Sequence, residues 1–173
     1  HLREESTKET EDLKSFCKNY NIKLNVLEVN EYKSKSNLEE QCREIRYHYF
    51  ESIYQGFDAL LVAHNQDDNI ETYLLQKKRG GIVEHFGLNE HTVIFNMKVI
   101  RPLLNFSKQS LLDFCDANKV PYSIDKTNLQ DGFERNKIRH SVVEKLSDDE
   151  RIEMVKEIEQ SNNQFNDLRK RIS

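Results

Sequence analysis

The stretch 59–81 constrains the fold of this chain more than any other, because a short apolar segment leads directly into an acidic helix start. Residues 60–63 have the apolar character of a buried strand, and polar and acidic residues follow them. A strand that ends in polar residues before a helix is typical of α/β proteins, which bind ligands beyond the carboxyl ends of their strands. A functional site is therefore predicted just after Ala63.

His64, Asp67, Asp68 and Glu71 follow this strand and form the candidate catalytic group. On a helix that opens near Asp67, the three carboxylates lie close enough in sequence to share one face, and converging oxygens suit Mg²⁺. Capping of free N–H groups would account for one aspartate at a helix start. Two aspartates, a glutamate one turn later and a histidine one turn earlier exceed that need, so a functional cluster is predicted.

Apolar periodicity along the chain alternates between helix and strand. The alternation predicts an α/β fold in which a parallel sheet is covered by helices on both faces, followed by a helical extension. The candidate boundary lies near Ser147 and divides the chain into 1–146 and 147–173. The predicted helices are 13–20, 38–49, 70–74, one capped by Ser107, 135–146 and 149–172; the predicted strands are 24–29, 60–63 and 92–100, and 121–133 is a predicted polar loop.

The net charge of −4 argues against a protein that coats nucleic acid indiscriminately, but it allows one that grips a single RNA with local basic patches. Arg43 and Arg46 lie three apart on a predicted helix, and Arg135 and Arg139 lie four apart. Each pair can therefore face one anionic surface. For Arg43 and Arg46, surface ion pairs with nearby glutamates are the alternative.

The three cysteines, Cys17, Cys42 and Cys115, are widely spaced at apolar positions of predicted helices. They are predicted to be small core residues, not disulfides or zinc ligands. The sequence also lacks an apolar run of about 18 residues, the length that spans a membrane. A reducing cytoplasm and no membrane partner are therefore expected.

Six short motifs occur in a fixed order along residues 1–146. They are LRxES at 2–6, LExxxRxxRY at 38–47, AHxxxDxxET at 63–72 followed by RG at 79–80, RPLL at 101–104, DxTN at 125–128 and RNxIR at 135–139. Together they resemble the tRNA(Ile)-lysidine synthases, a family of the N-type ATP pyrophosphatase (PP-loop) superfamily with a Rossmann-like fold. Six ordered motifs are far more specific than any one of them.

This resemblance implies an ATP-dependent ligase. Such enzymes adenylate C2 of the wobble cytidine of tRNA(Ile) with the anticodon CAU, then attach free lysine to give lysidine, releasing AMP and pyrophosphate. The implied cofactors are ATP and Mg²⁺. By matching positions, Asp68 and Glu71 would hold the metal or orient lysine, with Asp67 and His64 in support. The implied residues for binding substrate or tRNA are Arg43, Arg46, Arg79, Arg135, Asn136 and Arg139.

The phosphate loop of that family, SGGxDS, does not occur in the sequence and is expected upstream of His1. The 173 residues alone are therefore expected to be inactive and to bind ATP weakly. Residues 147–173 would be a helical linker or the start of a tRNA-facing domain. Two alternatives stay open, a tRNA-thiolating PP-loop enzyme and a non-catalytic tRNA-binding fragment. A homodimer and a further domain after Ser173 also stay open.

Overall fold

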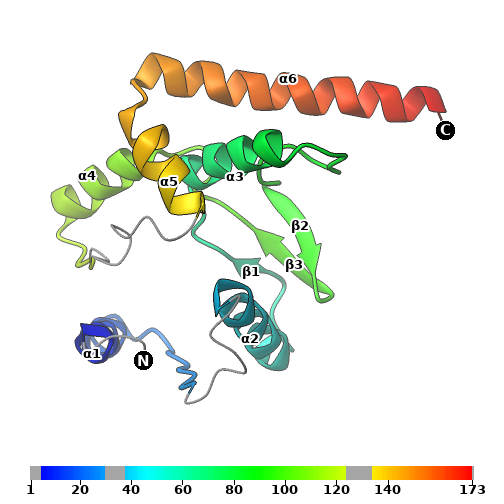
Figure 1. Cartoon of the computed structure of the whole chain (residues 1–173). Coiled ribbons are helices and arrows are strands. Elements are labelled where there is room, and N and C mark those ends of the chain that lie inside the picture. The colour runs from blue at the N-terminus through cyan, green and yellow to red at the C-terminus, as the bar shows by residue number, and fades with distance from the viewer. Residues whose placement is uncertain (1–4, 30–37, 124–133, 173) are drawn as a thin grey trace. The chain divides into compact units, whose positions relative to one another are not determined.

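The computed structural model describes residues 5–29, 38–123 and 134–172 (Figure 1). The chain divides into two compact units, one of residues 1–58 and 94–97 and one of residues 59–93 and 98–173. The first contains α1 (Glu5–Asn19) and α2 (Leu38–Ile53). The second contains α3 (Gln66–Arg79), α4 (Lys108–Asn118), α5 (Glu134–Ser141), the 3₁₀ helix η2 (Val143–Lys145) and α6 (Asp148–Ile172).

The sheet has three strands in the order β1-β3-β2 among the described residues. They are β1 (Leu60–Leu61), β2 (His91–Ile94) and β3 (Met97–Ile100). β1 runs parallel to β3, with Leu60 opposite Val99 and Leu61 opposite Ile100. The connection between them includes α3, as a parallel crossover requires. The α/β class is confirmed, and the parallel pair places the start of α3 just beyond the end of β1.

The predicted strand 92–100 is instead a hairpin of β2 and β3. Phe95 and Asn96 both adopt positive φ, at 48° and 61°. Two successive left-handed residues reverse the chain in two residues, so β2 and β3 run antiparallel and the sheet is mixed. One continuous strand was predicted because the turn contains the apolar residue Phe95 and no glycine, so the apolar pattern has no break there.

The predicted strand 24–29 is wrong, because residues 22–29 form no regular secondary structure. Val26 and Leu27 are each 44% exposed, and within the described residues no strand pairs with this segment. A β-branched, apolar run becomes a strand only where a neighbour supplies the hydrogen bonds. The DxTN motif at 125–128 and most of the predicted loop 121–133 lie outside the described residues, as do the first three residues of the LRxES motif.

The helix predictions are largely confirmed. Ser107 caps α4 as predicted, and its side chain accepts from the Ser110 amide at 3.2 Å. The helix predicted at 135–146 is divided into α5 and η2. α6 begins one residue before its predicted start. Within the described helices, none is long and apolar enough to cross a membrane.

The core of the second unit lies between α3, η2 and α6. Ile70, Tyr73, Val143 and Ile158 are its buried members. Ile158 belongs to the apolar stripe predicted on α6, whereas Ile152 of that stripe is 50% exposed. Phe86 packs edge-on against Tyr73 and Phe165, with ring centroids 5.9 and 6.4 Å apart. α6 is thereby docked along α3, as Figure 1 shows.

Gly87 is required where the chain leaves α3 and returns toward the sheet. Its φ is +69°, and a Cβ there would lie 2.3 Å from Oδ1 of Asn69. That oxygen accepts from the Leu88 amide at 2.7 Å. Asn69 is buried, so it has little room to move. The turn therefore needs glycine both for its backbone angle and for its close approach to α3.

Gly87→Ala is expected to lower the free energy of unfolding by about 1–3 kcal/mol, measured by urea unfolding of the full-length protein. Gly81→Ala is the matched control, because φ is +100° there but nothing lies within 4 Å of its Cβ. The control isolates backbone strain from the clash. Equal losses in the two variants would mean that the contact with Asn69 is unimportant.

Candidate functional site

The candidate site is built on the first turn of α3, directly after β1. Asn65 is the N-cap, and its side chain accepts from the Asp68 amide at 3.2 Å, while Asp68 Oδ2 accepts from the Asn65 amide at 3.0 Å. This reciprocal pair is a capping box. The capping interpretation of the acidic residues is thus correct for Asp68. The box also fixes the orientation of its carboxylate, whose other oxygen, Oδ1, faces α5.

Asp67 joins three helices through one oxygen. Its Oδ1 accepts from the Lys108 amide of α4 at 3.0 Å and from Nη1 of Arg151 of α6 at 3.0 Å. Asp67 is only 6% exposed, so its charge needs these donors. It sits at the amino-terminal end of both α3 and α4, where helix dipoles favour a carboxylate.

Glu71 is fully buried and is held by the two arginines of α5. Arg139 donates through Nε to Oε1 and through Nη2 to Oε2, the latter at 3.0 Å, and Arg135 donates through Nε to Oε2 at 2.9 Å. Both guanidinium groups also lie near Asp68 Oδ1, at 3.5 and 3.6 Å. The hydrogen bonds with Glu71 raise the pKa of Arg139. The predicted spacing of Arg135 and Arg139 is correct, and the anionic group that they face here is Glu71.

His64 is bound by an arginine from the end of β3. Arg101 donates through Nε to Nδ1 of His64 at 3.1 Å, and Arg101 itself is 5% exposed. Because Nδ1 accepts, the neutral ring carries its proton on Nε2. The sequence marked Arg101 only as part of the RPLL motif, and its place at the end of a strand adjacent to β1 was the signal for this contact.

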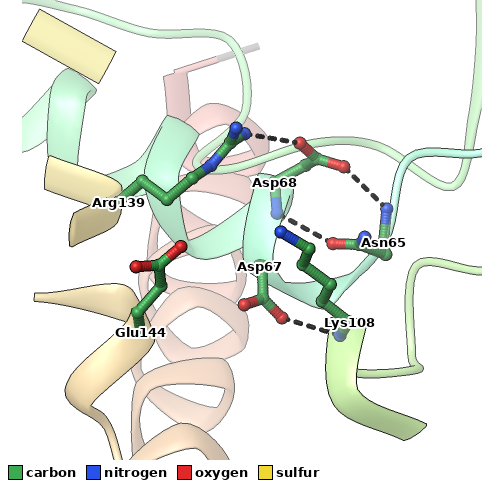
Figure 2. A pocket seen from close by; sticks show the side chains of 6 residues that line it. All are labelled: Asn65, Asp67, Asp68, Lys108, Arg139 and Glu144. Carbon is green, nitrogen blue, oxygen red and sulfur yellow. Dashed lines mark hydrogen bonds and ion pairs between the residues drawn. The ribbon is translucent and has the colours of Figure 1, made fainter. Parts of the chain in front are cut away.

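A pocket of about 200 Å³ opens beside the first turn of α3, and Figure 2 shows the side chains around it. It is lined by Asn65, Asp67, Asp68, Lys108, Arg139 and Glu144. Three carboxylates and two cations therefore surround one small volume. The lining brings together the predicted residues Asp67, Asp68 and Arg139.

Lys108 and Glu144 line the pocket but were not predicted. Lys108 is the first residue of α4, directly after the predicted cap Ser107. Its ammonium makes no hydrogen bond or ion pair with a described residue. Glu144 lies 2.8 Å from Nδ1 of His140, and this contact lowers the pKa of Glu144. Neither residue belongs to the motifs, so only the fold could reveal them.

The remaining predicted residues are not among those that line the pocket. Arg43 and Arg46 are on α2, in the first unit, and the Arg43 guanidinium lies 5.3 Å from the Tyr47 ring centre. Arg79 is exposed and lies 3.8 Å from Glu134, which also binds Lys78 at 2.7 Å. Asn136 is half-buried on α5. Their roles in binding substrate or tRNA stay predictions.

The carboxylates do not form a metal site in this arrangement. Among the residues that the structure describes, no group of three or more histidine, cysteine, aspartate or glutamate side chains is placed to hold a metal ion. Both oxygens of Glu71 accept from arginines, and Asp68 Oδ2 accepts from the Asn65 amide. These oxygens are thus engaged by protein donors and are poor ligands for Mg²⁺, which is usually held by one or two carboxylates together with waters and substrate phosphates. The metal role of Asp68 and Glu71 stays a prediction.

Comparison with known proteins identifies the family to which the chain belongs. Its sequence is 39% identical over 151 residues to a tRNA(Ile)-lysidine synthase of Mesomycoplasma hyopneumoniae, covering 86% of this chain and 50% of the relative. A protein of the same name from Mycoplasma mycoides is 35% identical over 175 residues, covering 98% of this chain and 42% of the relative. The chain thus spans half or less of the length of these relatives.

The family model of the PP-loop domain matches residues 1–146. The chain therefore belongs to the PP-loop domain family.

Proposed function

We propose that this chain carries the pocket of a tRNA(Ile)-lysidine synthase, which joins lysine to the wobble cytidine of tRNA(Ile) with the anticodon CAU. One observation carries the proposal. The relative from Mycoplasma mycoides bears that name and aligns with 98% of the chain, so the alignment includes the pocket residues. The PP-loop family supports the use of ATP.

The proposed reaction has two steps, and each sets a requirement. In the first, the C2 oxygen of cytidine attacks the α-phosphorus of ATP, and pyrophosphate leaves. In the second, the ε-amine of lysine attacks C2, the bond between C2 and the oxygen breaks, and AMP leaves with that oxygen while the amine loses a proton. The second step needs an amine that is held and aimed at the activated carbon.

The pocket suits a ligand that carries both signs of charge. In this proposal Asp68 Oδ1 accepts from an ammonium group of lysine, and Lys108 and Arg139 bind a carboxylate or a phosphate. The described bonds between Arg139 and Glu71 use Nε and Nη2, so Nη1 remains as a donor for the ligand. His64 follows β1, is bound by Arg101 and does not line the pocket, so its role in the proposal is indirect.

Glu71 acts in this proposal through the arginines. It is fully buried beneath them, so it orients both guanidinium groups and does not touch the ligand. Arg135 and Arg139 would then present their remaining donors to the tRNA backbone or to the activated nucleotide.

Arg135→Ala and Arg139→Ala are expected to weaken binding of tRNA(Ile) and to reduce the slope of log affinity against log salt by roughly one unit per lost phosphate contact. The measurement is a salt titration of tRNA binding to the full-length protein. Lys137→Ala is the control, because it removes an exposed cation from the same helix. An unchanged affinity and slope with a lower melting temperature would show that the two arginines serve only to bind Glu71.

The proposed function itself is tested by incorporation of labelled lysine into tRNA(Ile) by the full-length protein and ATP. The control tRNA has uridine in place of the wobble cytidine and should accept no lysine. Sulfur transfer without lysine incorporation would favour the thiolating alternative. Tight tRNA binding with neither transfer would favour the non-catalytic one.

A further inference from the structure

Arg151 lies at the start of α6, beyond the residues 1–146 that the PP-loop family model matches. Its side chain is 12% exposed and makes two directed hydrogen bonds. Nη1 donates to Asp67 Oδ1 at 3.0 Å, and Nη2 donates to the carbonyl of Val143 at 2.7 Å. One guanidinium group therefore joins α3 to η2.

One acceptor of Arg151 lines the pocket, and the other is next in sequence to a residue that does. Asp67 lines the pocket itself, and Val143, which is fully buried and does not line it, directly precedes the lining residue Glu144. The position of Asp67 relative to the segment that carries Glu144 therefore depends on a planar donor that reaches both Asp67 and Val143. A guanidinium group can do so because its nitrogens are held in a rigid fork.

Arg151 also determines the charge that the pocket offers to a ligand. Asp67 is buried, and apart from Arg151 its described donor is the neutral amide of Lys108. Without the guanidinium group, the Asp67 carboxylate would lose its only described ionic partner and would compete for the Lys108 ammonium, which already interacts electrostatically with Glu144. That cation would then be withdrawn from a ligand.

We propose that Arg151 is a positioning residue for the amino-acid substrate, acting through Asp67 and Val143 to set the width and charge of the pocket. The proposal rests on the proposed function, because it takes lysine as the ligand. It assigns part of the site to a helix that the family match does not include.

The test measures kcat and KM of the full-length protein in the lysine incorporation assay. Arg151→Ala is expected to raise KM for lysine about tenfold or more, as for loss of a charged hydrogen bond, with a smaller change in kcat and none in KM for ATP. Arg151→Lys should recover only part of the loss, since one ammonium cannot bridge both acceptors. Lys156→Ala, which removes an exposed cation from the same helix, should leave all constants unchanged.

A double variant separates positioning from general stability. The test compares the effect of Arg151→Ala on KM for lysine in the wild type and in the Asp67→Asn variant. If Arg151 acts through the charge of Asp67, the increase in KM should be smaller in the Asp67→Asn variant. Unchanged KM for lysine in Arg151→Ala, with or without a lower melting temperature, would overturn the proposal while leaving the function standing. A wild-type protein without lysine incorporation would overturn both.

Discussion

Glu71→Ala is expected to lower the free energy of unfolding by about 3–5 kcal/mol, the cost of breaking a buried ion pair from one side. The glutamate is fully buried, and its removal leaves two guanidinium groups, of Arg135 and Arg139, with Asp68 as their described ionic partner. The measurement is urea unfolding of the full-length protein, monitored by circular dichroism. Amide hydrogen exchange should also show faster opening of α5, since Glu71 holds that helix against α3.

Glu134→Ala is the matched control for this prediction. Glu134 also binds two cations, Lys78 and Arg79, but it lies on the surface. Exposed ion pairs contribute little, because water and salt screen them. Glu134→Ala should therefore leave the unfolding curve nearly unchanged. A loss of similar size in both variants would show that burial of Glu71 does not determine its contribution.

If the proposed function is correct, Asp68→Ala is expected to reduce kcat/KM for lysine incorporation about 100-fold, because the proposal assigns its carboxylate to an ammonium group of lysine. Asp68 also belongs to the capping box of α3, so the same substitution costs about 1 kcal/mol of stability. Lost activity alone would therefore not identify its role. The measurement needs a variant that disrupts the cap and keeps the carboxylate.

Asn65→Ala provides that control. It removes the side-chain acceptor for the Asp68 amide and so opens the same capping box, while Asp68 remains. We expect a similar loss of stability in both variants and a much larger loss of activity in Asp68→Ala, because Asn65 also lines the pocket but carries no charge to bind an ammonium group. Equal activity in the two variants would mean that Asp68 serves the helix and not the substrate.

The local part of this site could be predicted from the sequence. Asp68 follows Asn65 at the spacing of a capping box, and the apolar segment before His64 predicted a strand that ends beside the first turn of α3. The tertiary part could not be predicted in this way. Glu71 has helical spacing from Asp68, which favoured one shared ligand, but its partners come from α5, 64 and 68 residues later. Spacing shows which groups can share a face and not which groups will cover it.

The same reason explains the misassigned strands. Residues 24–29 and 92–100 have similar apolar character, yet the first forms no strand and the second forms two. A strand exists only with its partner, and the partner of β3 on one side is β1, nearly forty residues earlier in the sequence. Helices satisfy their backbone hydrogen bonds locally, so their positions were predicted far better.

The long sequence separation of the contacts around α3 affects the order in which the molecule assembles. Asp67 and Arg151 are 84 residues apart, and Glu71 and Arg135 are 64 apart. Contacts that close such long loops form late, because the entropy of the intervening chain opposes them until other contacts have brought the ends together. During synthesis on a ribosome, β1 and α3 emerge long before α5 and the first turn of α6. The carboxylates of Asp67 and Glu71 therefore lack their arginine partners while the chain grows, and Asp67 gains its partner only after Arg151 has left the exit tunnel.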